Sequence, residues 1–493
     1  KSERAVKYRD VCANSESAID QRINNVRARL LGGGDCWWNF SDGRYIVPKV
    51  DLSSGQQEVS SLYAGAVWIG GFDDFDNLKL ACQDYRSSTA QDFWPGPLDP
   101  VQGNTEAVMC KNWDRHFRVT GDEIRLHLRN LSAGNLNPSE IPRGLREWPA
   151  KGNPYFVDVW GFDLPFTDQA LAGFFDADED RLYDPLKGDY PSIDIRGCPN
   201  DRYPDEMIFW IYNDEGGGQE HTASRGRAIR MEVQVQAFEY ANNDALNDMT
   251  FQRYKLINRA TDPIDSTFFA MWTDPDLGCA DDDRIGCDTS LSLMYVYNQD
   301  PIDGITGNTC AGTPTYNDKV PMIGVDYFRG PLKPITPDSS VELGMSSFMY
   351  YNRPGVAGGN WPNAMVDPET PLAFYRFITG SWADGTPCTF GGSGYNPGTT
   401  AAEIDFVFPQ QPNISSGWSM CTANLGIGDR RCLQASGPFR LNPGAVNELI
   451  IGVPWVPAAT VEQFLRETLE DRTVEVEHPG GSVWSVRGNR HSV

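Results

Sequence analysis

The residues with the most distinctive chemistry are aspartates that cluster in two loops. The first loop reads DADEDRLYDP and carries carboxylates at alternate positions. Calcium takes about six to eight oxygen ligands, and short Asp side chains on a turning loop can converge on it. The spacing predicts a calcium-binding loop similar to that of an EF-hand. Its candidate ligands are Asp176, Asp178, Asp180, the backbone carbonyl of Leu182, Asp184 and Asp189.

Two positions of this first loop depart from the EF-hand pattern. Arg181 stands where the turn normally has Gly, and Lys187 stands where the bidentate Glu belongs. Asp189 can supply the missing carboxylate, and no pair of flanking helices is predicted. Because closely spaced carboxylates repel one another, the sequence favours a bound cation over a solvated acidic loop.

A second group of aspartates lies in the segment TDPDLGCADDDRIGCDT, between two predicted strands. We predict a second calcium site that orders this long loop, with an acidic surface loop as the alternative. Its candidate ligands are Asp274, Asp276, Asp281, Asp282, Asp283 and Asp288.

The chain has eleven cysteines and five histidines, all of them dispersed. No C-x-x-C motif occurs, which argues against a zinc ribbon or a thioredoxin-type site. The cysteines indicate a few disulfides in an oxidising compartment, with reduced cysteines that pack as small hydrophobes as the alternative. The local pairs expected first are Cys279–Cys287 and Cys421–Cys432, and the odd count leaves one thiol free or bonded to another chain.

Signals of catalysis are weak, so the sequence leans away from an enzyme. It contains no G-x-S-x-G elbow, no Walker motif and no H-E-x-x-H. A glycosidase needs only two carboxylates, which leaves that activity open. Four tryptophans in predicted loops offer a platform for sugars, although packing beneath long loops is the simpler explanation. They are Trp37, Trp38, Trp94 and Trp361.

The elements that must position these loops are mainly β-strands. In residues 228–237 apolar and polar residues alternate, which predicts one buried and one solvated face, and a change of phase at Ala237-Phe238 predicts a bulge or a strand end. Helices are predicted at 16–31 and 461–470. Further strands are predicted at 250–258, 266–273, 291–297, 343–351 and 446–456. This pattern predicts an antiparallel β-sandwich or jelly roll with long loops rich in Gly, Pro and Asp and a few short helices.

Length and charge limit the organisation and the partners. The 493 residues divide into an expected N-terminal β region with an initial helix (1–150), an Asp-rich β-sandwich region (151–456) and a C-terminal helix and tail (457–493). The net charge of −25 argues against a nucleic acid partner. No stretch approaches the ~18 apolar residues of a membrane helix. The chain begins with Lys and a polar segment, which we interpret as a processed N-terminus.

Several long segments resemble one family. They are INNVRARLLGGGDCWWNFSDGRYIVPK, SLYAGAVWIGGFD, DFWPGPLD, DPDLGCADDDRIGCDTSLSLMYVYN, GVDYFRGPL and DRRCLQASGPFRLNPGAVNELIIGVPWV. They are similar to large secreted Bacteroidota proteins exported by the type IX secretion system, over about residues 23–456. The resemblance implies export, cell-surface location, and removal of a signal peptide and a C-terminal sorting domain. The family's first acidic loop usually reads D-x-x-G-D-G-x-Y-D-P, so Glu179 and Arg181 replace its glycines here.

Two functions are consistent with these observations. The first is a calcium-stabilised structural or adhesive protein, extracellular or on the cell surface, which self-associates into a filament or surface layer. The alternative is a secreted protein that binds or degrades polysaccharide. The family resemblance, the acidic loops and the lack of a catalytic motif favour the first.

Overall fold

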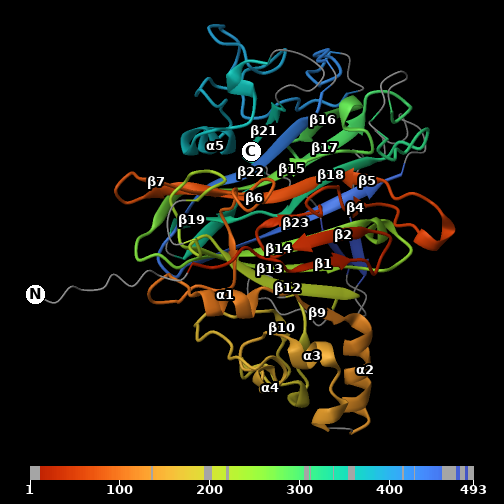
Figure 1. The fold of residues 1–493 in the computed structure, drawn as a ribbon, viewed down its shortest axis with the longest axis vertical. Helices are drawn as coiled ribbons and strands as arrows, with labels where there is room; N and C mark the ends of the chain where they lie inside the picture. Colours follow the sequence, from red (N-terminus) through yellow and green to blue (C-terminus); the bar gives the residue numbers. More distant parts are fainter. Residues whose placement is uncertain are drawn as a thin grey trace, which may run out of the picture.

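The computed structural model of this chain consists mainly of antiparallel strands in two large sheets, with few and short helices (Figure 1). The predicted mainly β fold with sandwich architecture is therefore confirmed. The structure describes residues 11–134, 137–193, 203–217, 221–304, 310, 312–336, 338–353, 361–412, 416–426 and 428–457, with two short strands at 474–477 and 483–486.

The first sheet has ten strands, in the order β21-β22-β15-β6-β3-β2-β4-β5, with β1 paired to β2 and β7 paired to β6. Its strands are β1 (Ala18–Gln21), β2 (Arg27–Leu31), β3 (Asp35–Cys36), β4 (Tyr45–Ile46), β5 (Ser60–Leu62), β6 (Ala64–Asp73), β7 (Leu78–Cys82), β15 (Ile264–Asp274), β21 (Ser347–Asn352) and β22 (Arg430–Leu441). The predicted regions 1–150 and 151–456 both contribute strands to this sheet. Strand β6 pairs with β3 of the first region on one side and with β15 of the second region on the other.

The second sheet has nine strands, in the order β16-β17-β18-β23-β14-β13-β12-β8, with β9 also paired to β12. Its strands are β8 (Trp94–Pro95), β9 (Phe117–Thr120), β12 (Glu206–Asn213), β13 (Met231–Glu239), β14 (Met249–Asn258), β16 (Asp283–Asp288), β17 (Leu293–Asn298), β18 (Met322–Arg329) and β23 (Val446–Val456). The predicted strands at 250–258, 291–297 and 446–456 correspond to β14, β17 and β23, and 266–273 corresponds to β15 of the first sheet.

The remaining elements are short. Three hairpins pair β10 (Phe174–Phe175) with β11 (Tyr190–Pro191), β19 (Leu332–Thr336) with β20 (Ser339–Glu342), and β24 (Val474–Glu477) with β25 (Val483–Val486). The α-helices are α1 (Ala107–Trp113), α2 (Gly121–Ser132), α3 (Arg143–Glu147), α4 (Phe156–Trp160) and α5 (Pro371–Ile378). The 3-10 turns are η1 (Leu52–Ser54), η2 (Pro138–Glu140), η3 (Pro185–Lys187), η4 (Ala245–Asp248), η5 (Ala280–Asp282) and η6 (Asn363–Met365). Among the described residues, no helix is long and apolar enough to cross a membrane.

The nine-stranded sheet has an apolar core on each of its faces. Along β12, Ile208 and Trp210 belong to the core shared with the ten-stranded sheet, whereas Met207 and Phe209 belong to a second core. The second core is completed by residues of the segment 107–193, which contains α1–α4 and is called the covering segment below. Its helices lie beyond β12 in Figure 1. Helices α1–α4 therefore cover a face that would otherwise be solvated.

This second core corrects the prediction for residues 228–237. Strand β13 is buried along its whole length, and its polar side chains lie under the covering segment, where Gln236 donates to the carbonyl of Ser192. No bulge occurs at Ala237-Phe238, because pairing with β12 continues in register up to Glu239, where the strand ends. The apparent change of phase arises because the covered face, which is polar at Glu232, Gln234 and Gln236, continues with Phe238, a member of the second core.

The predicted helix at 16–31 is wrong. These residues form the antiparallel hairpin β1–β2, in which Ile19 pairs with Leu30. The apolar spacing suits one face of a helix, but β2 also pairs with β3 and β4, and such pairings outweigh local periodicity. The predicted helix at 461–470 lies outside the described residues.

One extended segment connects the edges of the two sheets. At the β21 edge, the N–H of Phe348 donates to the carbonyl of Asp405, and Val407 donates back to Phe348. One residue further, the carbonyl of Phe408 accepts from the N–H of Cys287 on edge strand β16. Residues 405–408 therefore close the sandwich along this side.

Candidate metal sites

The first acidic loop joins the two strands of the β10–β11 hairpin. Glu179 and Arg181 both adopt left-handed backbone conformations, with φ of 61° and 66°. Glycine adopts such conformations freely, but both positions carry side chains here. The loop therefore turns at two left-handed residues without glycine.

Three carboxylates of this loop converge. Ligand oxygens of Asp176, Asp178 and Asp189 lie within 4.8 Å of one another. Asp189 is fully buried and accepts from the N–H groups of Ala177 and Asp184, both at 2.8 Å, and burial raises its pKa to about 6. A buried oxygen of Asp176 has no hydrogen-bond partner among the described residues. These oxygens are suitable ligands for a hard cation.

The other predicted ligands of the first loop serve different contacts. The ammonium of Lys187 contacts Asp180 and lies 3.2 Å from Asp178, so it already neutralises part of the loop. Asp184 accepts from Leu186 at the start of η3, and the N–H of Leu182 donates to Asp180. The ammonium of Lys187 therefore competes with any metal cation for the carboxylates of this loop.

The second acidic loop divides into two groups of carboxylates. In the first group, ligand oxygens of Asp282 and Asp303 lie within 4.8 Å of each other and of the Cys279 sulfur. Asp303 accepts from the N–H groups of Cys279 and Tyr316, and Asp282 accepts from Gly304 at 2.9 Å. Backbone donors thus hold both carboxylates in place.

This group carries buried negative charge without a matching cation. Asp282, Asp283 and Asp303 are at most 6% exposed, and none of them forms an ion pair within the described part of the chain. Burial first, and then the neighbouring carboxylates, raise the pKa of each, that of Asp303 to about 6. One oxygen each of Asp282 and Asp283 is buried without a partner. Uncompensated buried carboxylates are costly, which favours a bound cation.

The second group of this loop consists of Asp274, Asp276 and Asp429, whose ligand oxygens also lie within 4.8 Å of one another. Asp288 is in neither group, because it accepts from Ser290 and Leu291 in the turn after β16. Asp281 is in neither group as well.

Two ligands were missed at the level of sequence. Asp303 follows β17 in the turn DPIDG, and Asp429 directly precedes β22. The Asp-Pro and Asp-Gly signals near residue 303 indicated a turn at the end of a predicted strand. Asp429 gave no comparable signal, because the strand that places it was not predicted.

The disulfides differ from the predicted pairs. The structure has Cys12–Cys110 and Cys279–Cys310, while Cys287, Cys421 and Cys432 are free. Cys287 lies buried in β16, where its sulfur donates to the carbonyl of Val407, and Cys432 lies buried in β22. Strand geometry thus separates cysteines that are neighbours in sequence. The two disulfides indicate an oxidising compartment.

The Cys279–Cys310 disulfide also defines the role of sulfur at the metal site. Because Cys279 is oxidised, its sulfur is no thiolate ligand, and the oxygens of Asp282 and Asp303 are left as donors. The disulfide brackets the segment that contains both carboxylates, and it holds the loop closed around them.

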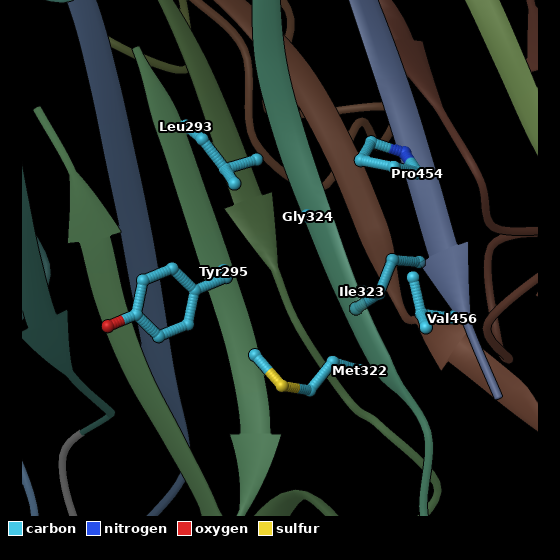
Figure 2. A pocket seen from close by; sticks show the side chains of 7 residues that line it. All are labelled: Leu293, Tyr295, Met322, Ile323, Gly324, Pro454 and Val456. Carbon is cyan, nitrogen blue, oxygen red and sulfur yellow. The ribbon is translucent and has the colours of Figure 1, made fainter. Parts of the chain in front are cut away.

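The proposed sugar platform is not supported. Trp37, Trp38 and Trp94 are at most 7% exposed and pack in the interior, and Trp361 is partly buried. A small cavity between β17, β18 and β23 has apolar walls and no carboxylate (Figure 2). Its lining residues are Leu293, Tyr295, Met322, Ile323, Gly324, Pro454 and Val456. This cavity therefore lacks the carboxyl pair that glycoside hydrolysis requires.

Comparisons with known proteins add no assignment. No protein family matches the sequence, and a search of curated proteins finds no match.

Proposed function

We propose that this chain is an exported, calcium-stabilised structural or adhesive protein of the cell surface, a subunit of an extracellular filament or surface layer. The observation that carries the calcium part is the group of Asp282 and Asp303 with the adjacent Asp283, whose buried carboxylates have no cationic partner among the described residues. The two disulfides support an exported location, and the resemblance to type IX cargo proteins is the argument for the cell surface.

Calcium would act by linkage between binding and folding. Asp282 and Asp303 come from η5 and from the turn after β17, so a bound ion joins segments about twenty residues apart. An ion that binds only the folded chain stabilises it by about 2.7 kcal/mol at a concentration ~100-fold above its Kd. The same ion removes the repulsion that otherwise opposes closure of the loop.

The test compares thermal unfolding of the wild type and Asp282→Asn in calcium and in excess chelator. In the wild type, chelator should lower the Tm markedly. In Asp282→Asn, the Tm should be lower than that of the wild type in calcium but equal or higher in chelator, because one repelling charge is gone. Asp288→Asn is the matched control, since this carboxylate only holds a surface turn.

Equal effects of Asp282→Asn in both conditions would contradict the calcium assignment. The assembly part is tested separately, by negative-stain imaging of the full chain in calcium and in chelator. Ordered polymers that dissolve in chelator would support a calcium-dependent subunit, and dispersed particles in both conditions would contradict it.

The carbohydrate alternative predicts a different result. Retention of the full chain on insoluble polysaccharide, without polymers in the images, would favour a carbohydrate-binding protein. The burial of three of the four candidate tryptophans weighs against that result.

A further inference from the structure

A separate carboxylate group lies at one end of the paired strands β15 and β22. Asp274 is the last residue of β15, Asp276 follows two residues later, and Asp429 directly precedes β22. Because Thr273 pairs with Cys432, the end of one strand lies beside the start of the other. This pairing brings together carboxylates that are more than 150 residues apart in sequence.

The arginines near this group leave one buried carboxylate oxygen, Oδ1 of Asp274, without a partner among the described residues. Arg431 pairs with Oδ1 of Asp429, and Arg353 lies 3.6 Å from its Oδ2. Arg431 also lies 3.5 Å from Oδ2 of Asp274, and the hydroxyl of Tyr85 donates to that same oxygen. The other oxygen of Asp274, Oδ1, is buried and has no partner among the described residues. Asp274 is only 2% exposed, so water does not readily satisfy this oxygen.

Asp276 is the second unmatched group. Burial first, and then Asp274 and Asp429, raise its pKa well above the usual range, and this outweighs the opposite effects of Arg431 and Arg353. Asp276 is half-buried, and its carboxylate forms no hydrogen bond or ion pair within the described part of the chain. A cation between the three side chains would satisfy Asp274 Oδ1 and the Asp276 carboxylate together.

We propose that Asp274, Asp276 and Asp429 bind a hard divalent cation of the calcium class, distinct from the ion at Asp282 and Asp303. This proposal rests on the proposed calcium dependence and adds a second ion to the same loop. The donors are all carboxylate oxygens without histidine or thiolate, which suits calcium, and water would complete the coordination. The ion clamps the end of β15 to the start of β22.

The two groups are close enough to influence each other. Asp276 is among the carboxylates that raise the pKa of Asp283, which lies beside the first group. A cation bound at Asp276 therefore also lowers the negative potential at Asp283, which weakens the attraction of a second cation to the first group. Occupation of the two sites should be negatively coupled.

The test counts calcium ions on the full chain by native mass spectrometry, after removal of metal with chelator and titration with calcium. The variants are Asp429→Asn, Asp282→Asn and their combination, with Asp288→Asn as the control. Each single variant should bind one ion fewer than the wild type, the combination two fewer, and the control the same number. If Asp429→Asn fails to fold because Arg431 loses its partner, Asp276→Asn gives the same readout.

The outcomes separate this inference from the proposed function. An unchanged count in Asp429→Asn and Asp276→Asn, with one ion lost in Asp282→Asn, would overturn the second site and keep calcium. Loss of one ion in each single variant, and of only one ion in the combination, would overturn the proposal of two distinct sites. Absence of calcium from the wild type would overturn the calcium dependence itself.

Discussion

The imidazole of His221 lies fully buried between two carboxylates. Its Nδ1 lies 2.7 Å from the carbonyl oxygen of Leu80, and its Nε2 lies 2.7 Å from that of Asp214. Carbonyl oxygens only accept hydrogen bonds, so both ring nitrogens must carry a proton. The side chains of Asp92 and Asp214 lie 3.7 and 3.8 Å from the ring, which places a buried cation between two buried anions.

The pH dependence of stability tests this charge. Burial lowers the pKa of His221, but Asp92 and Asp214 outweigh it and raise the pKa above its ordinary value. A raised pKa means that the contribution is complete below the unfolded value of about 6.5 and is lost as pH rises through the folded value. His221→Gln should therefore lower the free energy of unfolding more at pH 6 than at pH 9. The expected loss at pH 6 is up to about 3–5 kcal/mol.

The measurement is urea unfolding of wild type and variant at both pH values. His127→Gln is the control, because burial lowers the pKa of His127, so its penalty should not be larger at pH 6 than at pH 9. Equal penalties for His221→Gln at pH 6 and pH 9 would show that the ring is neutral.

At the scale of elements, an ion pair fastens the covering segment to the nine-stranded sheet. Arg259 donates to both oxygens of Glu232 on β13, at 3.1 and 3.0 Å. The same guanidinium donates to Gln169 and Thr167 of the covering segment. Both charged side chains are at most 3% exposed, so removal of one leaves the other buried and unpaired.

Arg259→Met should lower the free energy of unfolding by about 3–5 kcal/mol, because Glu232 then remains as an uncompensated buried charge. Adding Glu232→Gln should recover part of this loss, and a double-mutant cycle in urea measures the coupling. Arg440→Met breaks an exposed pair with Asp265 and should cost about 0–1 kcal/mol. A cost for Arg259→Met as small as that of Arg440→Met would contradict this role.

Sequence patterns predicted several strands and missed others. Strands β14, β15, β17 and β23 were predicted within a few residues of their limits. Strand β12 was missed because its apolar run does not alternate and cannot be distinguished from a buried helix by periodicity, and β22 was missed because Gly437-Pro438 interrupts it. The aspartate clusters were visible because their members are adjacent in sequence. Asp303 and Asp429 were not, because strand pairing alone brings them to the clusters.

For the whole molecule, the two disulfides differ in what they enclose. Cys12–Cys110 closes a loop of 98 residues that joins the N-terminal segment to α1, and Cys279–Cys310 closes 31 residues around Asp282 and Asp303. Both should limit the freedom of the unfolded chain, but only the second lies next to a candidate metal site.

Replacing either pair by serine should therefore lower stability by about 2–5 kcal/mol in urea unfolding. Calcium affinity, measured by titration calorimetry, should weaken for Cys279→Ser/Cys310→Ser and stay unchanged for Cys12→Ser/Cys110→Ser. Equal affinities in the two variants would show that the Cys279–Cys310 disulfide does not organise the metal site.

Residues 405–408, which connect β21 and β16, also protect the chain from misassembly. An uncovered sheet edge is a template on which strands of other molecules can add and grow into fibrillar aggregates. A single segment shields two such templates, one from each sheet. A proteolytic cut that released this segment would expose both at once, so an intact sandwich could become a seed for amyloid-like growth without first unfolding.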